Sequence, residues 1–228
     1  MFNESGVKVF GIDRLLGCKA YFDGKVFDIS ASVTSETGVQ DANVKIYAHN
    51  GYGNPDVLRE LINIERPDAI LHFTDPRYWI WLYEIAHEIR QSVPLLFYHI
   101  WDDLPDPKYN RDYYESCDWI GCISKLTYGI VNRVGKMDNG KTWNQLEDWQ
   151  VSYVPHGINT DIYKPADVPA DYRKEILGDK EYDFVLYWNN RNIRRKQPMD
   201  AMLAFEEFRK TLTSEQQQKA CMVMHTEP

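Results

Sequence analysis

The chain has 228 residues, a formal net charge of −8 and a hydrophobic fraction of 43 %. An apolar fraction of this size is typical of globular proteins and excludes an intrinsically disordered chain. The negative charge disfavours a general binder of nucleic acids or anionic membranes, because such proteins need a basic surface.

Short apolar runs alternate along the chain with longer segments of helical periodicity. We expect strands at residues 7–12, 26–33, 44–48, 69–73, 94–100, 119–123, 151–154, 184–188 and 220–225. We expect helices to begin at Pro55, at Asp75–Pro76, near Tyr109, after the N-cap candidate Ser124, near Asp171 and at Pro198. Strands that alternate with helices are typical of parallel β-α-β units.

The predicted fold class is therefore α/β, with a Rossmann-like, doubly wound parallel sheet that binds ligands at the carboxyl ends of its strands. Residues 69–73 are apolar without polar alternation, which favours a sheet covered on both faces. A cluster of Pro155, Gly157 and Pro165 predicts a domain boundary. Beyond it, one strand–helix–strand unit of about 60 residues buries too little core for a whole domain.

The cysteines and the amino terminus point to a reducing compartment. Cys117 and Cys122, the closest pair, have a spacing found neither in zinc sites nor in thioredoxin-type motifs. No basic region followed by an apolar stretch opens the chain, so no signal peptide is predicted. No apolar run approaches the roughly 20 residues that cross a bilayer. We expect a cytoplasmic protein without a transmembrane segment.

Residues 135–142 match the pattern G-x-x-x-x-G-K-[ST] of P-loop nucleotide-binding proteins. That loop needs a strand before it and a helix after it, so that backbone N–H groups converge on phosphate. Here residues 126–134 are expected to be helical, and residues 143–145 do not begin a strong apolar helix. An exposed loop is the preferred interpretation, and a P-loop ATPase is kept as an alternative.

His99 is expected at the carboxyl end of a central parallel strand, where such folds bind ligands. A histidine there could orient a sugar or act as an acid or base near neutral pH. The alternative is a hydrogen-bonded histidine beside a solvated acidic loop. Asp102, Asp103 and Asp106 follow it, but no flanking ligands impose a geometry on a divalent ion, so no metal site is predicted.

A basic segment from Arg191 to Lys196 lies between the strand that ends at Trp188 and the helix that begins near Pro198. Basic groups beside a helix N-terminus suit a phosphate group, through charge-assisted hydrogen bonds and the helix dipole. A solvated turn is the alternative interpretation.

Several segments resemble, in order and spacing, the family 4 glycosyltransferases of the GT-B fold. Residues 153–165, YVPHGINTDIYKP, are similar to the segment that joins the two domains in that family, and they include Gly157 and Asn159. After a further strand the family has an Arg and, five positions on, a Lys, which correspond to Arg191 and Lys196. Upstream matches complete the pattern.

The upstream matches lie in the first half of the chain. Residues 66–72, RPDAILH, and residues 120–124, IGCIS, are similar to two strands of the family's first domain. His99 falls where that domain places its histidine. The resemblance covers about residues 40–228.

The resemblance implies a retaining, metal-independent transfer of a sugar from a nucleotide-sugar to an acceptor, with the nucleotide-sugar as substrate and no cofactor. Arg191 and Lys196 would bind the donor diphosphate, which is the main electrostatic task in such a reaction. His99, as the catalytic residue, would contact the donor sugar. Gly157 and Asn159 would serve donor binding between the domains.

In this interpretation residues 1–155 form the acceptor-side domain and residues 156–228 an incomplete donor domain. The family's Gly-rich loop after the first strand is not recognisable, because Gly51 and Gly53 lie too far along the chain. The later acidic motif of the family is expected beyond the residues given. The sequence thus predicts a shortened enzyme, and a non-catalytic α/β binding protein of the same fold is the alternative from another class.

Overall fold

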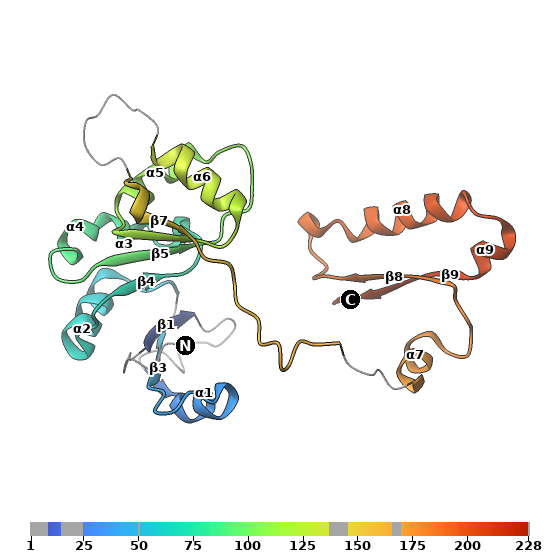
Figure 1. The fold of residues 1–228 in the computed structure, drawn as a ribbon, viewed down its shortest axis with the longest axis horizontal. Coiled ribbons are helices and arrows are strands. Elements are labelled where there is room, and N and C mark those ends of the chain that lie inside the picture. The colour runs from blue at the N-terminus through green and yellow to red at the C-terminus, as the bar shows by residue number, and fades with distance from the viewer. Residues whose placement is uncertain (1–8, 15–24, 50, 137–145, 166–169, 228) are drawn as a thin grey trace. The chain divides into compact units, whose positions relative to one another are not determined.

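The structure is a computed structural model that describes residues 9–14, 25–49, 51–136, 146–165 and 170–227 (Figure 1). The chain divides into two compact units, Met1–Gly157 and Ile158–Pro228. Parallel strands alternate with helices in both units, so the α/β class predicted from the sequence is confirmed. No helix in the described part of the chain is long and apolar enough to span a bilayer.

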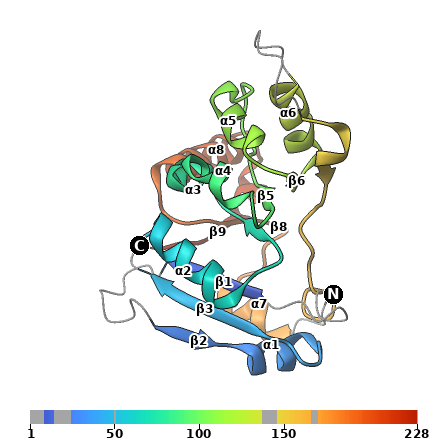
Figure 2. The same cartoon turned by 90° about the vertical axis from the view of Figure 1, so that its left-hand side faces the viewer.

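The first three strands form a sheet of their own at one end of the first unit (Figure 2). Its strands are β1 (Val9–Arg14), β2 (Val26–Asp28) and β3 (Val44–His49), in the order β1-β3-β2. β1 runs parallel to β3, whereas β2 runs antiparallel to it. Because these strands do not join the next sheet, the reversal of strand order that defines a doubly wound sheet is missing from the described residues.

The strand expected at residues 26–33 is wrong beyond Asp28, because helix α1 (Ser30–Thr37) follows it. The carboxylate of Asp28 accepts a hydrogen bond from the Ser30 N–H at 3.0 Å, which turns the chain out of the strand. Gly38 ends the helix in the left-handed conformation, and its N–H donates to the Thr34 carbonyl. Glycine adopts this conformation without steric cost.

A four-stranded parallel sheet forms the centre of the first unit, in the order β4-β5-β6-β7. Its strands are β4 (Ile70–His72), β5 (Leu95–His99), β6 (Trp119–Cys122) and β7 (Val151–Tyr153). Each strand here pairs with the next strand along the chain. When such parallel strands are joined by right-handed crossovers, the connecting helices all lie on the same face of the sheet. The predicted cover on both faces is therefore wrong for this sheet as described: Leu71 and Phe73 remain 55 % exposed.

Five α-helices of the first unit contribute buried side chains to the apolar core on this sheet. They are α2 (Pro55–Glu65), α3 (Ile80–Glu84), α4 (Ala86–Ile89), α5 (Arg111–Glu115) and α6 (Lys125–Gly135), with short 3-10 helices η1 (Pro76–Tyr78), η2 (Lys108–Asn110) and η3 (Asp148–Gln150). Pro55 opens α2 as predicted, and the Asn54 side chain caps that helix by accepting from the Asp56 and Val57 N–H groups.

Ser124 caps α6 as the sequence predicted. Its hydroxyl accepts a hydrogen bond from the Thr127 N–H at 3.0 Å. Replacing an N-cap serine by alanine leaves that N–H without its partner. We expect Ser124→Ala to lower the free energy of unfolding by about 1 kcal/mol in urea denaturation. Ser32→Ala, at an exposed position inside α1, is the control and should leave stability unchanged or slightly raised; equal losses in the two variants would contradict the capping role.

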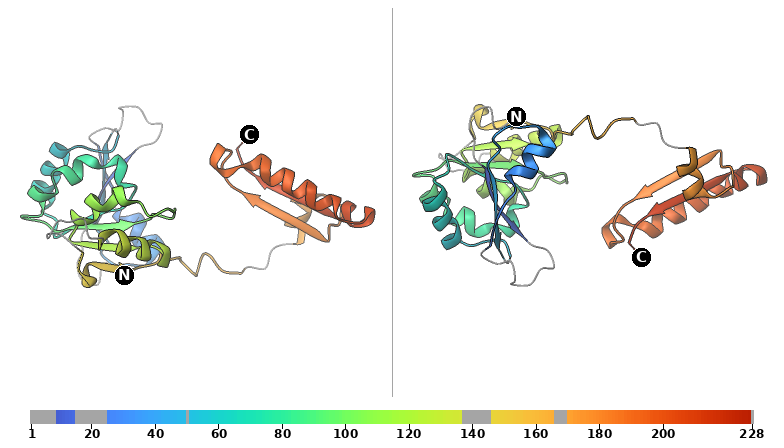
Figure 3. Two further views of the ribbon diagram at one scale, coloured as in Figure 1. Left: turned by 90° about the horizontal axis from the view of Figure 1, so that it is seen from above. Right: turned by 90° about the horizontal axis from the view of Figure 1, so that it is seen from below.

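The second unit pairs β8 (Phe184–Asn189) with β9 (Ala220–His225) as parallel strands, and α8 (Pro198–Lys210) lies along them (Figure 3). Helices α7 (Ala170–Leu177) and α9 (Ser214–Gln218) and the 3-10 helix η4 (Arg194–Lys196) complete its described elements. Among the described residues of this unit, Ala220 alone is buried. A single strand–helix–strand unit buries little apolar surface, as expected from its size.

Candidate functional site

Strands β4 and β5 both end in a histidine, His72 and His99, at the carboxyl edge of the central sheet. Both side chains are almost fully buried, with 4 % and 1 % of their surfaces exposed. His72 pairs with Phe97 across the two strands, and His99 lies two positions further along β5. Because side chains alternate along a strand, Phe97 and His99 share the helix-covered face of the sheet. The sequence placed His99 at this strand end, and the structure has it there.

Each histidine contacts the hydroxyl of a tyrosine that a neighbouring helix supplies. His72 Nδ1 lies 2.6 Å from the Tyr83 hydroxyl of α3, and His99 Nε2 lies 2.8 Å from the Tyr114 hydroxyl of α5. The other two ring nitrogens, His72 Nε2 and His99 Nδ1, are buried without a hydrogen-bond partner in the described residues. The Phe97 ring lies within ring-contact distance of both histidines, with centroids 5.0 Å from His72 and 4.6 Å from His99.

Burial keeps both imidazoles neutral. Removal from water lowers the pKa of His72 to about 4 and the pKa of His99 to about 3, because a buried positive charge is poorly solvated. The nearby Asp75 carboxylate opposes the shift at both rings, while His72 adds to it at His99. Neutral imidazoles at physiological pH suit hydrogen bonding to a ligand better than proton exchange.

A paired charge follows β4 next to these histidines. The Asp75 carboxylate accepts the Arg77 N–H of η1 at 3.0 Å and binds the Arg77 guanidinium in a forked ion pair. The guanidinium holds the pKa of Asp75 below its usual value. Arg77 also lies over the Trp101 ring, 5.5 Å from its centroid, and Tyr109 meets that ring edge-on. This edge of the sheet thus combines aromatic rings, neutral donors and a compensated ion pair.

The open face of the sheet holds the start of the segment that joins the two units. The Tyr98 hydroxyl donates to the Val154 carbonyl at 2.7 Å and lies 3.2 Å from His156 Nδ1. The Phe73 ring meets the His156 ring edge-on, with centroids 6.0 Å apart. These contacts tie the chain to the first unit up to His156, one residue before Gly157 ends that unit.

Gly157 and Asn159 lie in this joining segment. A Cβ added at Gly157 would meet nothing within 4 Å, so the position has room for a side chain. Asn159 opens a turn: its side-chain oxygen accepts from the Asp161 N–H at 2.9 Å, and its carbonyl accepts from the Tyr163 N–H at 2.9 Å. Asparagine commonly stabilises turns in this way. The donor-binding role of both residues stays a prediction.

Arg191 and Lys196 lie in the connection between β8 and α8, as the sequence predicted for the basic segment. Arg191 is exposed, and its ion pair with the exposed Glu227 is long, at 3.7 Å. Lys196 forms no ion pair within the described residues. Gln197 precedes α8 in the left-handed conformation, and no side chain caps the helix. The first N–H groups of α8, Arg191 and Lys196 can therefore bind an anion. The Asp200 carboxylate in the first turn makes the electrostatic potential there less positive.

His99 belongs to the first unit, and Arg191 and Lys196 belong to the second. That all three contact one substrate therefore stays a prediction. The P-loop alternative lies largely outside the described residues, which include Gly135 and Lys136 but not Lys141. Gly135 is the last residue of α6, so a helix rather than a strand precedes this segment. Phosphate loops of that class follow a strand, so the structure does not favour this alternative.

Metal ligands do not gather in the described part of the chain, where no group of three or more His, Cys, Asp or Glu side chains could hold an ion. Cys117 and Cys122 are buried as free thiols. Burial raises the pKa of Cys122 to about 12, which leaves it an unreactive thiol.

Sequence reasoning missed His72, Tyr83 and Tyr114 as members of the site. The signal for His72 was present, because it ends a short apolar strand in the same way as His99. The tyrosines gave no such signal, because Tyr83 lies 11 residues after His72 and Tyr114 lies 15 residues after His99 along the chain.

Comparisons with known proteins add no family to this description. No protein-family model matches the sequence, and no match is found among curated proteins.

Proposed function

We propose that the protein is a retaining, metal-independent glycosyltransferase of the GT-B type, which moves a sugar from a nucleotide-sugar to an acceptor. The observation that carries this proposal is the position of Arg191 and Lys196 between β8 and the uncapped start of α8. The segment at residues 153–165 precedes them with the spacing of family 4 glycosyltransferases. The nucleotide-sugar is the substrate, and no cofactor takes part.

The chemistry needs charge compensation at the leaving group. A nucleoside diphosphate departs with negative charge on its phosphates, and cations beside a helix N-terminus stabilise that charge as it develops. Arg191 is exposed and only loosely paired, so it can contact a phosphate without breaking a strong ion pair. In this proposal the second unit binds the donor diphosphate.

The first unit contributes His99 to the same substrate. Its pKa of about 3 keeps the imidazole neutral, which favours a hydrogen bond to a sugar hydroxyl over acid–base catalysis. Its deep burial also favours the alternative, a non-catalytic binding protein of the same fold, because a ligand reaches the ring only after neighbouring side chains move. Nucleotide binding separates the two.

The test titrates the full chain with UDP, GDP and ADP by calorimetry. We expect at least one of these nucleotides to bind, and Arg191→Ala and Lys196→Ala each to weaken that binding about tenfold or more, because each removes a charge-assisted hydrogen bond. Lys210→Ala is the matched control: it removes the same charge from the opposite end of α8, where Lys210 pairs with Glu207 at 2.6 Å.

Three results would count against the proposal. Absence of binding by all three nucleotides would favour the non-catalytic binding protein. Loss of binding in Lys141→Ala, with Arg191→Ala unaffected, would favour the P-loop ATPase. Equal weakening in Lys210→Ala would indicate a general charge effect rather than a site at the start of α8.

A further inference from the structure

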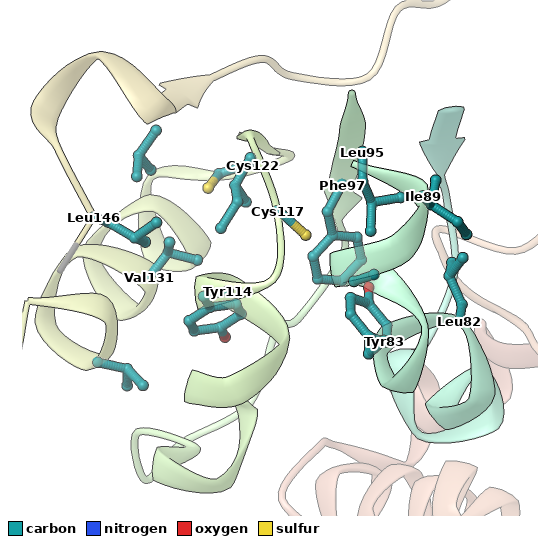
Figure 4. Close-up of a cluster of buried hydrophobic side chains, with 14 of the residues drawn as sticks. Leu82, Tyr83, Ile89, Leu95, Phe97, Tyr114, Cys117, Cys122, Val131 and Leu146 are labelled. Carbon is teal, nitrogen blue, oxygen red and sulfur yellow. The ribbon is translucent and has the colours of Figure 1, made fainter. Parts of the chain in front are cut away.

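Two tyrosine hydroxyls lie inside the core of the first unit, each against one strand-end histidine. Figure 4 shows Tyr83 and Tyr114 among the buried apolar side chains, with Phe97 close to Tyr83. Tyr114 is fully buried and Tyr83 is 9 % exposed. A polar group in such surroundings is costly unless it forms a hydrogen bond. The two pairs, His99 with Tyr114 and His72 with Tyr83, repeat the same arrangement on neighbouring strands.

The direction of each hydrogen bond follows from counting donors. In a neutral imidazole one nitrogen carries hydrogen and the other accepts. If His99 donated to Tyr114, the His99 Nδ1 lone pair would lack a partner among the described residues. The phenol proton would lack one too, because the neighbouring buried Asn110 amide lowers the pKa of Tyr114, as a donor beside the phenol oxygen does. If Tyr114 donates, a single N–H on His99 is left over. The second arrangement leaves fewer buried groups unpaired and is therefore more stable.

The same count applies to the pair on β4. The Tyr83 hydroxyl lies 2.6 Å from His72 Nδ1, and His72 Nε2 has no partner among the described residues. Burial raises the pKa of both phenols above the ordinary value, so both keep their protons to donate. The free nitrogen differs between the pairs: Nε2 at His72 and Nδ1 at His99.

We propose that Tyr114 and Tyr83 are positioning residues, which donate hydrogen bonds to His99 Nε2 and His72 Nδ1 and so hold each imidazole in one tautomer. His99 then keeps its hydrogen on Nδ1 and His72 on Nε2. Both nitrogens are buried near the carboxyl ends of neighbouring strands, and a ligand reaches them only when neighbouring side chains move. This makes His72 a second ligand-binding histidine beside His99. The ligand class is an uncharged hydroxyl-bearing group such as a sugar, because two neutral donors match oxygen acceptors. The binding of a sugar by these histidines rests on the proposed function, whereas the assignment of the two tautomers does not.

The experiment records long-range 1H–15N correlation spectra of the histidine side chains in the full chain at neutral pH. Signals are assigned from their loss in His72→Gln and His99→Gln. We expect hydrogen on Nδ1 of His99 and on Nε2 of His72. Tyr114→Phe should change the tautomer ratio of His99 about fivefold or more, because one hydrogen bond sets it, and should leave His72 unchanged. Tyr83→Phe should do the reverse.

Tyr113→Phe is the matched control, because it removes a hydroxyl from the same helix, where the Tyr113 ring packs against Tyr83. It should leave both ratios unchanged. Hydrogen on His99 Nε2 in the wild-type protein, or an unchanged ratio in a folded Tyr114→Phe, would overturn the proposal. No nucleotide is present in this measurement, so its failure is distinguishable from a failure of nucleotide binding.

Discussion

Phe97→Ala is expected to lower the free energy of unfolding by about 3–5 kcal/mol, the range found when a buried aromatic side chain is removed from a core. Phe97 has no exposed surface and lies in the middle of β5. Its ring contacts those of His72, Tyr83 and His99 at centroid distances of 5.0, 6.2 and 4.6 Å. The loss combines the removed apolar contacts with the cavity that the surrounding side chains cannot fill.

Urea denaturation followed by tryptophan fluorescence measures this change, since six of the seven tryptophans lie in residues 1–157. Phe73→Ala is the matched control. It removes the same side chain from the open face of the same sheet, where Phe73 is 55 % exposed, and should cost about 1 kcal/mol or less. A similar loss in both variants would show that the two faces of the sheet are buried alike, contrary to the structure.

Acidification from pH 7 to pH 5 is expected to destabilise the protein by about 2 kcal/mol for each of His72 and His99. Burial lowers the pKa of these groups from 6.5 to about 4 and about 3. The two imidazoles therefore take up protons more readily in the unfolded chain than in the folded chain. The free energy that these neutral histidines contribute to folding is fully present above their pKa in the unfolded chain. It is lost as the pH falls through that pKa toward their lower pKa values in the folded chain.

The window from pH 7 to pH 5 lies above the range in which carboxylates such as Asp75 titrate. Urea midpoints at both pH values should show the loss, and His72→Gln and His99→Gln should each reduce the difference between them by about 2 kcal/mol. His87→Gln, at an exposed position of α4, is the control and should retain the full difference. An unchanged difference in both core variants would mean that the imidazoles are not buried as neutral groups.

Several elements could be predicted because the information is local. Pro55 and Ser124 mark helix starts through their own backbone and side-chain chemistry, and the apolar run that ends at His99 is a strand as expected. The helix after Asp28 was missed, because a short apolar run does not tell where a strand stops. Its end depends on a hydrogen bond between the Asp28 side chain and the Ser30 backbone.

The sequence by itself determined that the chain is acidic with one basic segment, that strands alternate with helices, and that a histidine ends β5. Only the tertiary structure decided that helices in the described residues cover one face of the central sheet and that Tyr83 and Tyr114 contact His72 and His99. The physical reason is distance along the chain. Periodicity and capping report interactions within a few residues, whereas these hydroxyls reach their imidazoles only when the β-α-β crossovers pack the helices onto the sheet.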